Sequence, residues 1–300
     1  MSVRMNPFYV TNLVSALDQV QSNQEQLSSQ LSSGVRVTSL SSDPIAAGQN
    51  VLLLNEIQRD DSFTQSSSLV QGQLQVADSA LGDVVTQLTQ AISLATSGSN
   101  GTLNTSQLQS IANQISGIRD QVVSAANTSY QGQYIFGGTI SSSMPFTTDS
   151  STSPATTTYS GDEGVNYLQT PNGQNIQLNI PGDQIFTTSG SNSVFTALNN
   201  LISDFSSGSV TAAATDLQSL NTAMNYVSQQ RVALDNSLTR ITAATDAVSS
   251  QETQLTAAQT NLMQADLATI STKLSLSESQ QTALESVISA LGSGSLFDKL

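Results

Sequence analysis

The chain has 300 residues, enough for a sizeable core, and carries 22 Asp and Glu against 8 Lys and Arg, a net charge of −14. This excess of acid disfavours DNA, RNA and anionic membrane surfaces as partners, because binding to phosphate groups requires Lys and Arg. The sequence contains no His and no Cys, which excludes disulfides, thiolate or histidine-ligated metal sites, Ser-His-Asp triads and Cys nucleophiles.

The N-terminal segment predicts an amphipathic helix that ends near Ser33. Its apolar side chains follow the three-four spacing of a helix and are Val10, Leu13, Leu17, Val20, Leu27 and Leu31. Gly34 comes directly after this pattern and suits a left-handed cap position. The segment lacks the apolar run and the small-residue cleavage site of a secretory signal peptide, so we expect no cleaved signal peptide.

The second predicted helix begins at Asp43-Pro44, an N-cap followed by proline at the first helical position, and continues to about Thr96. A turn over residues 98–101 separates it from a third helix over about 108–125, so the two helices should lie antiparallel. The longest aliphatic run, Val51–Leu54, is too short to cross a bilayer, and we expect no membrane insertion.

The helical period disappears beyond Gln133. Tyr134–Thr139 is aromatic and β-branched and contains two glycines, which predicts a strand and a tight turn. Further strands are predicted at Thr156–Tyr159, Val165–Leu168, Ile176–Ile180 and Gln184–Thr187. We interpret residues 141–191 as a small inserted β domain, with a disordered loop as the alternative.

The longest predicted helix runs from about Thr211 to Leu262 and follows a shorter helical segment over residues 195–205. Aliphatic side chains recur in it every seven residues, the spacing of helices that wrap around each other, at Leu220, Val227, Leu234, Ile241, Val248, Leu255 and Leu262. The companion column becomes polar. Its members Arg231, Glu252 and Gln259, together with Asp266, either set the register or contact a neighbouring subunit, or are simply exposed where the bundle opens.

A last helix has its apolar stripe in a new phase, which indicates a different packing partner. The stripe is Leu267, Ile270, Leu274, Leu284, Ile288 and Leu291. Because both chain ends are amphipathic, we predict a mainly α fold, an elongated antiparallel coiled coil or helical bundle formed by the N- and C-terminal segments with a small inserted β domain. The predicted domains are terminal helices in 1–42 and 265–300, a helical rod in 43–140 and 192–264, and an outward β-rich insertion in 141–191.

Carboxylate pairs are the remaining candidates for catalysis. Asp60 and Asp61 are adjacent on a predicted helix and are expected on the solvated surface. Asp162 and Glu163 lie between two glycines and indicate a turn, with a weak calcium loop or a glycosidase pair as alternatives.

Three aromatic side chains, Tyr130, Tyr134 and Phe136, are expected to pack at the end of the bundle rather than to form a ligand platform. We therefore predict that the protein is not an enzyme, with no catalytic, cofactor-binding or metal-binding residue and no cofactor.

Four segments carry a resemblance to a known family. The segment Leu27–Gly48, LSSQLSSGVRVTSLSSDPIAAG, resembles the bacterial flagellin family, in which such a segment joins the innermost helix to the rod domain. The segments YIFGGT at Tyr134–Thr139, YSGD at Tyr159–Asp162 and SLFDKL at Ser295–Leu300 are similar to the branch of that family found at the junction of hook and filament.

The resemblance implies a structural protein of the bacterial flagellum, exported through the flagellar type III channel and located outside the cell. Its implied partners are copies of itself in a ring, the first hook-associated protein, flagellin and a flagellar export chaperone. A short flagellin that forms the filament itself is the alternative, and a secreted coiled-coil adhesin is a further one. The residues predicted to pack in the assembly are Leu13, Leu17, Val20, Leu27, Leu31, Leu220, Val227, Leu234, Ile241, Val248, Leu255, Leu262, Ile270, Leu274, Leu284, Ile288 and Leu291.

Overall fold

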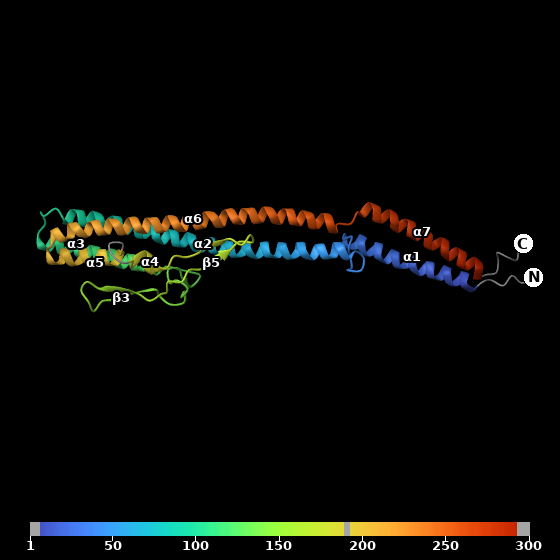
Figure 1. Ribbon diagram of the computed structural model, residues 1–300, viewed down its shortest axis with the longest axis horizontal. Helices are drawn as coiled ribbons and strands as arrows, with labels where there is room; N and C mark the ends of the chain where they lie inside the picture. The colour runs from blue at the N-terminus through green and yellow to red at the C-terminus, as the bar shows by residue number, and fades with distance from the viewer. Residues whose placement is uncertain (1–6, 189–192, 293–300) are drawn as a thin grey trace, which may run out of the picture. The chain divides into compact units, whose positions relative to one another are not determined.

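The computed structural model describes residues 7–188 and 193–292 and confirms the mainly α class (Figure 1). The helices of these residues are α1 (Pro7–Ser33), α2 (Pro44–Gly98), α3 (Thr105–Ala126), α4 (Gly182–Phe186), α5 (Val194–Ser207), α6 (Val210–Met263) and α7 (Leu267–Gly292). The segment Ser295–Leu300, which contributes to the family resemblance, lies outside the described residues. None of the helices within the described ranges combines the length and the hydropathy needed to cross a membrane.

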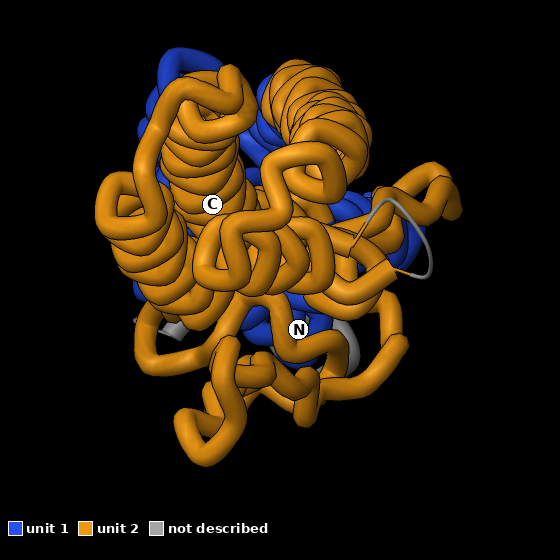
Figure 2. Tube along the Cα trace, turned by 90° about the vertical axis from the view of Figure 1, so that its left-hand side faces the viewer, with its two compact units in different colours: residues 1–59, 251–300 blue, residues 60–250 orange. Residues whose placement is uncertain are grey.

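The chain divides into two compact units, shown in different colours in Figure 2. Unit 1 is formed by residues 1–59 and 251–300, and unit 2 by residues 60–250. Both boundaries fall inside long helices, so α2 and α6 each contribute to both units.

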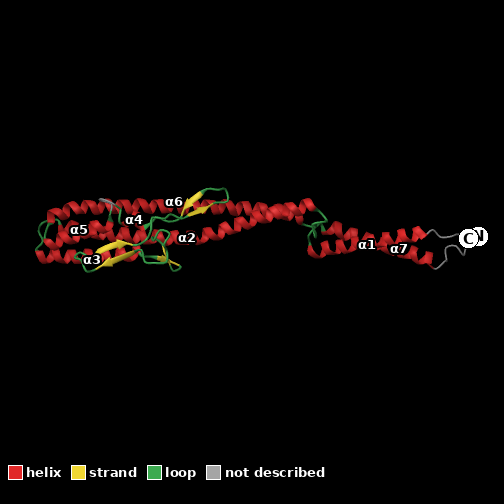
Figure 3. Cartoon of the chain, turned by 60° about the horizontal axis from the view of Figure 1, so that its bottom comes forward, coloured by secondary structure: helices red, strands yellow, loops and turns green. Residues whose placement is uncertain are grey.

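In unit 1, helices α1 and α7 lie side by side (Figures 1 and 3). Their apolar side chains are only partly covered. Ile270 is buried, whereas the half-buried members are Leu13, Leu17, Val20, Leu27, Leu274, Leu284 and Ile288. Each of these two helices covers only one side of the other, so much of each stripe stays accessible to water.

Unit 2 holds the main core, in which α3 packs on α5 and the long helices α2 and α6 contribute facing heptad columns. The α6 column is buried at Leu220, Val227, Leu234, Ile241 and Val248. The α2 column is buried at Leu74, Leu81, Leu88 and Ala95, again seven residues apart. The seven-residue spacing therefore marks the seam between these two helices, as expected for coiled-coil packing.

The strands of unit 2 form three separate antiparallel pairs (Figure 3). They are β1 (Ser129–Tyr130) with β2 (Gln133–Tyr134), β3 (Phe146–Asp149) with β4 (Thr156–Tyr159), and β5 (Tyr167–Gln169) with β6 (Asn175–Gln177). The strand expected at Thr156–Tyr159 is present as β4. Those expected at Val165–Leu168 and Ile176–Ile180 are shorter and shifted. The strand expected at Gln184–Thr187 is wrong, because Gly182–Phe186 forms the short helix α4.

An aromatic cluster joins the hairpins to the helices. Phe146 of β3 lies edge-to-face on Phe186 with ring centroids 5.4 Å apart, and Phe136 meets Phe186 in the same way at 5.6 Å. Phe195 of α5 completes the cluster, 5.5 Å from Phe146. Phe136 is 1% exposed, so it packs in the core, as expected, and does not form an open ligand platform.

Candidate functional site

Exposed apolar side chains concentrate in unit 1. Of the fifteen large hydrophobic side chains that are exposed within the described residues, ten belong to it: Val14, Leu31, Leu40, Ile45, Val51, Leu52, Leu54, Leu267, Leu276 and Val287. Exposed apolar surface gathered in one region of a protein is typical of a contact surface for another protein.

The most exposed part of this surface lies at the start of α2. Ile45 is 76% exposed and Leu52 is 70% exposed, and their spacing of seven residues puts them on one helical face. Gly48 lies between them, and a side chain built there would meet nothing within 4 Å. We call Ile45, Gly48 and Leu52 the open α2 face.

Next to this face, the connection between α1 and α2 pairs with the connection between α6 and α7. Gly34 adopts φ +69° at the end of α1, a left-handed conformation in which glycine is favoured. The Arg36 N–H donates to the Met263 carbonyl at 2.7 Å, and the Ala265 N–H donates to the Gly34 carbonyl at 3.0 Å. We call residues 34–36 and 263–265 the paired connection.

Arg36 ties three helices to this connection. Its guanidinium Nη1 binds Asp43 Oδ2 at 2.9 Å, and its Nη2 donates to the Leu262 carbonyl at 3.2 Å. The Gln30 side chain of α1 donates to the Arg36 carbonyl at 2.7 Å. One residue thus links the end of α1, the start of α2 and the end of α6.

Two carboxylates cap the helices that leave the connection. Asp43 Oδ1 accepts the Ala46 N–H at 3.0 Å, and this bond, followed by the Arg36 guanidinium, lowers the pKa of Asp43. Asp266 accepts the Thr269 hydroxyl at 2.7 Å and the Thr269 N–H at 3.1 Å, and these bonds lower the pKa of Asp266. Both carboxylates are therefore held in the charged form that caps a helix best.

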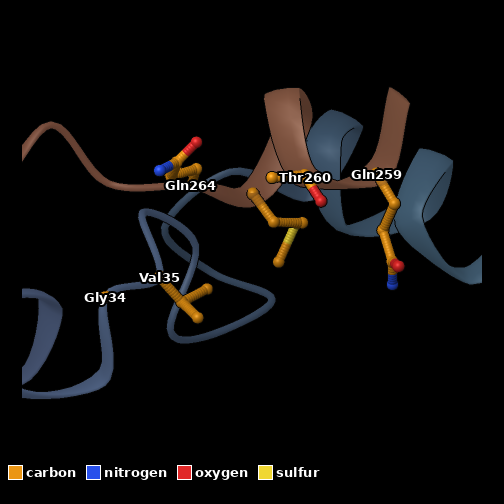
Figure 4. A pocket seen from close by; sticks show the side chains of 6 residues that line it. Gly34, Val35, Gln259, Thr260 and Gln264 are labelled. Atoms are coloured by element: carbon orange, nitrogen blue, oxygen red, sulfur yellow. The ribbon is translucent and has the colours of Figure 1, made fainter. Parts of the chain in front are cut away.

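A pocket of about 310 Å³ opens beside the paired connection (Figure 4). Figure 4 shows Val35 on one side, and Gln259, Thr260 and Gln264 on the other. Its lining is completed by Gly34 and Met263. Gln259 also donates to Asn50 Oδ1 of α2 at 3.0 Å, so the polar end of the α6 column joins α6 to α2 by an amide pair.

The polar residues singled out along and just after α6 have different surroundings. Arg231 forms two bonds to Asp78 of α2, and its guanidinium carbon would lie 3.6 Å from a Cβ on Gly82. Glu252 is half-buried, and Asp266 is the α7 cap. Arg231 and Gln259 therefore connect α6 to α2 within the chain.

The predicted packing residues divide between the two units. Leu220, Val227, Leu234, Ile241 and Val248 are buried in unit 2, whereas Leu255 and Leu262 in unit 1 are half-buried and Leu31 is 36% exposed. Leu291 belongs to α7, but its side chain lies outside the described part of the chain. Their role in assembly stays a prediction.

The expectation that Asp60 lies on the solvated surface is wrong, since Asp60 is 1% exposed while Asp61 is exposed. Asp60 falls in the heptad column of α2, seven residues before Ser67 and fourteen before Leu74, and Ser67 is buried as well. The seam of α2 therefore includes a polar stretch between apolar layers.

Asp162 is fully engaged in local structure. It accepts hydrogen bonds from the Thr139 hydroxyl and the Thr139 N–H, and from the Gly164 N–H at 3.2 Å. The Tyr159 hydroxyl donates to the Asp162 carbonyl at 2.8 Å. The bonds from Thr139 and Gly164 lower the pKa of Asp162, the Thr139 hydroxyl most. Together with the Tyr159 bond they join the YIFGGT and YSGD segments to each other.

In the described part of the chain, no group of three or more Asp or Glu side chains is placed to hold a metal ion. Of the side chains that hold the paired connection, Asp43 was predicted from the sequence as an N-cap, whereas Arg36 and Gln30 were not singled out individually. The available signal was the single Arg of the Leu27–Gly48 segment, since a lone cation between two helices and an N-cap Asp commonly has a partner.

Comparisons with known proteins find similarity to flagellar proteins. The family model for the bacterial flagellin N-terminal helical region matches residues 9–141. The flagellar hook-associated protein 3 of Salmonella typhimurium is 31% identical over 195 residues, covering 65% of this chain and 59% of that protein. The protein of the same name from Escherichia coli K12 is 31% identical over 166 residues, covering 55% and 50%.

The chain thus spans between half and three-fifths of the length of these curated relatives. Among solved structures, the flagellar junction protein FlgL from Legionella pneumophila superposes with a TM-score of 0.57 at 14% identity, covering 72% of this chain and 100% of that one. This likeness supports the same fold.

Proposed function

We propose that this chain, whose N-terminal region is of the bacterial flagellin type and whose named relatives are flagellar hook-associated proteins 3, is a structural component of the flagellum at the junction of hook and filament. The observation that carries the proposal is the paired connection. The LSSG-x-R segment and Asp43, which resemble the flagellin family in sequence, are the residues that tie α1, α2 and α6 together. The work of such a protein is mechanical and requires no enzymatic activity.

The proposed layout has three layers. Residues 1–42 and 265–300 form the inner layer of the assembly, residues 43–140 and 192–264 form the rod, and residues 141–191 face outward. The partly covered stripes of α1 and α7 support the first assignment, because burial of half-exposed leucines stabilises an assembly by about 25 cal/mol for each Å² removed from water.

The proposed partners are copies of the chain in a ring, the first hook-associated protein on one side and flagellin on the other. A flagellar export chaperone would cover the apolar stripe of α7 before the chain leaves the cell through the type III channel. The exposed side chains of unit 1, with the open α2 face, offer the apolar area that such contacts need.

Deletion of the gene tests the proposal. A junction protein seats the first flagellin layer, so the deletion strain should release monomeric flagellin into the medium and carry hooks without filaments. If this chain is instead a short flagellin, the filament subunit itself is missing and no flagellin of this kind accumulates in the medium. Electron microscopy with an antibody against the chain distinguishes the two. In the parent strain the antibody should label the hook tip if the chain is a junction protein, and the whole filament if it is a flagellin.

A variant of Arg36 tests whether the paired connection is needed for assembly. Arg36→Ala removes the bonds to Asp43 and to the Leu262 carbonyl, and we expect weaker complementation of motility at normal secretion. Thr38→Ala changes the same segment at an exposed position and serves as the control. Full motility of Arg36→Ala would show that the connection is not needed for assembly.

A further inference from the structure

Two Asn-Gly dipeptides occur in the chain, at Asn100-Gly101 and at Asn172-Gly173. In this dipeptide the asparagine side chain can react with the backbone, because glycine has no Cβ to hinder the approach of its nitrogen. Asn100 and Asn172 are both exposed, and both glycines have positive φ, +68° and +81°. The two sites are thus alike in sequence, exposure and backbone region.

The two sites differ in the hydrogen bonding of the glycine backbone nitrogen that would react. Asn172 lies in the tight turn between β5 and β6, where the Gly173 N–H donates to the Thr170 carbonyl at 2.8 Å. The turn is closed further by the Gln174 N–H, which donates to the Thr170 hydroxyl at 3.0 Å, and by the Thr170 N–H, which donates to the Gln174 carbonyl at 2.8 Å.

Asn100 lies in the loop between α2 and α3, directly after the end of α2. The preceding residue is fixed, since the Ser99 N–H donates to the Ala95 carbonyl at 2.9 Å. The next fixed point is Asn104, whose side chain caps α3 through the Gln107 N–H at 2.9 Å. The Gly101 N–H lies between these two points and has no backbone acceptor within the described residues.

We propose that Asn100 is a site of spontaneous deamidation in the folded protein and that Asn172 is protected by its turn. In the first step the Gly101 nitrogen attacks the side-chain carbonyl carbon of Asn100 and gives up its proton. A C–N bond forms, and the side-chain nitrogen leaves as ammonia, which yields a five-membered succinimide. Water then opens this ring at either carbonyl and leaves aspartate or isoaspartate.

The protection of Asn172 has a physical cause. Attack by Gly173 requires its N–H to leave the Thr170 carbonyl first, so only the fraction of molecules with an open turn can react. Breaking one such hydrogen bond reduces the reactive fraction about five- to ten-fold, and the two additional bonds of the turn reduce it further.

Trypsin separates the two sites, because cleavage after Arg59, Arg119 and Arg231 places Asn100 in the peptide 60–119 and Asn172 in the peptide 120–231. The folded full-length chain is incubated in mildly alkaline buffer, and the mass increase from the exchange of NH₂ for OH is followed in each peptide. We expect the change at Asn100 to be at least about five times faster than at Asn172.

The same incubation in concentrated urea is the control, since both sites lose their folded surroundings. There the two rates should become similar. Equal rates in the folded chain, a faster reaction at Asn172, or an unchanged ratio in urea would each overturn the proposal. The Asn100→Gln variant, whose longer side chain would have to form a six-membered ring, should lose the fast reaction and keep the slow one.

Discussion

Arg231 of α6 holds both carboxylate oxygens of Asp78 of α2, with Nη2 at 3.0 Å from Oδ2 and Nε bonded to Oδ1. The pair joins residues that are 153 positions apart in the sequence. It fixes the position of α6 along the axis of α2. Gly82 of α2 lies beside the guanidinium, at a distance where a Cβ would make ordinary van der Waals contact with it. A polar residue in a heptad column thus sets the register of the seam, which is a known use of such residues.

Replacing Asp78 by Asn should lower the free energy of unfolding by about 0.5–1 kcal/mol, because the pair is bidentate but partly exposed. A double-mutant cycle with Arg231→Gln measures the coupling by chemical denaturation. The nearby Asp83→Asn variant is the control, since no ion pair is formed by Asp83 among the described residues. Additive effects of the two changes would show that the pair contributes nothing to stability.

Asp162→Ala should lower the melting temperature of unit 2 and loosen the segments around Thr139 and Tyr159, since three hydrogen bonds to its side chain are lost. The lowered pKa of Asp162 means that its contribution is present above the ordinary value near 3.8 and disappears as the pH falls through the lowered pKa. The melting-temperature difference between the variant and the parent should therefore shrink in acid. Glu163→Ala is the matched control and should have no such effect.

The stability that Asp204 of α5 contributes should change with pH in the opposite direction. Burial, and then the neighbouring Asp216 carboxyl of α6, raise the pKa of Asp204 to about 6. A carboxyl whose folded pKa is raised stabilises the fold fully below its ordinary value near 3.8, and this stability is lost as the pH rises through about 6.

Asp204→Asn should consequently stabilise the protein at pH values above 6 and have little effect near pH 4. Because the group is only partly buried, solvent screening reduces the full effect to about 1 kcal/mol. Urea unfolding at several pH values checks this, with Asp83→Asn as an exposed control. Stabilisation by the same amount at all pH values would contradict the assignment.

Ser67 is fully buried in the α2 column, and its hydroxyl has no hydrogen-bond partner in the described part of the chain. Ser67→Ala removes this unpaired group and should raise the free energy of unfolding by about 1 kcal/mol. The neighbouring Ser68 is exposed and donates to the Thr64 carbonyl at 3.0 Å, so Ser68→Ala reports helix propensity together with the loss of this surface hydrogen bond. The difference between the two variants in free energy of unfolding gives the cost of burying the unpaired Ser67 hydroxyl. A difference of zero would show that this cost is absent.

The sequence alone was sufficient for the long helices and for where α1 ends and α2 begins. The seven-residue column from Leu220 to Val248, the stop at Gly34 and the start at Asp43-Pro44 are local signals, and the structure has α6, α1 and α2 where these signals place them. Periodicity and capping depend on residues a few positions apart, so they can be recognised without knowing the rest of the fold.

Only the tertiary structure decided which distant side chains meet. The pairing of Arg36 with the Leu262 carbonyl, of Arg231 with Asp78, and the burial of Asp60 depend on the alignment of segments separated by more than a hundred residues. Two of the predicted strands were shifted and Gln184–Phe186 became helical, because the aromatic cluster around Phe186 supplies the burial that decides their conformation. Local patterns specify a helix, but the register between helices is fixed by contacts that exist only after folding.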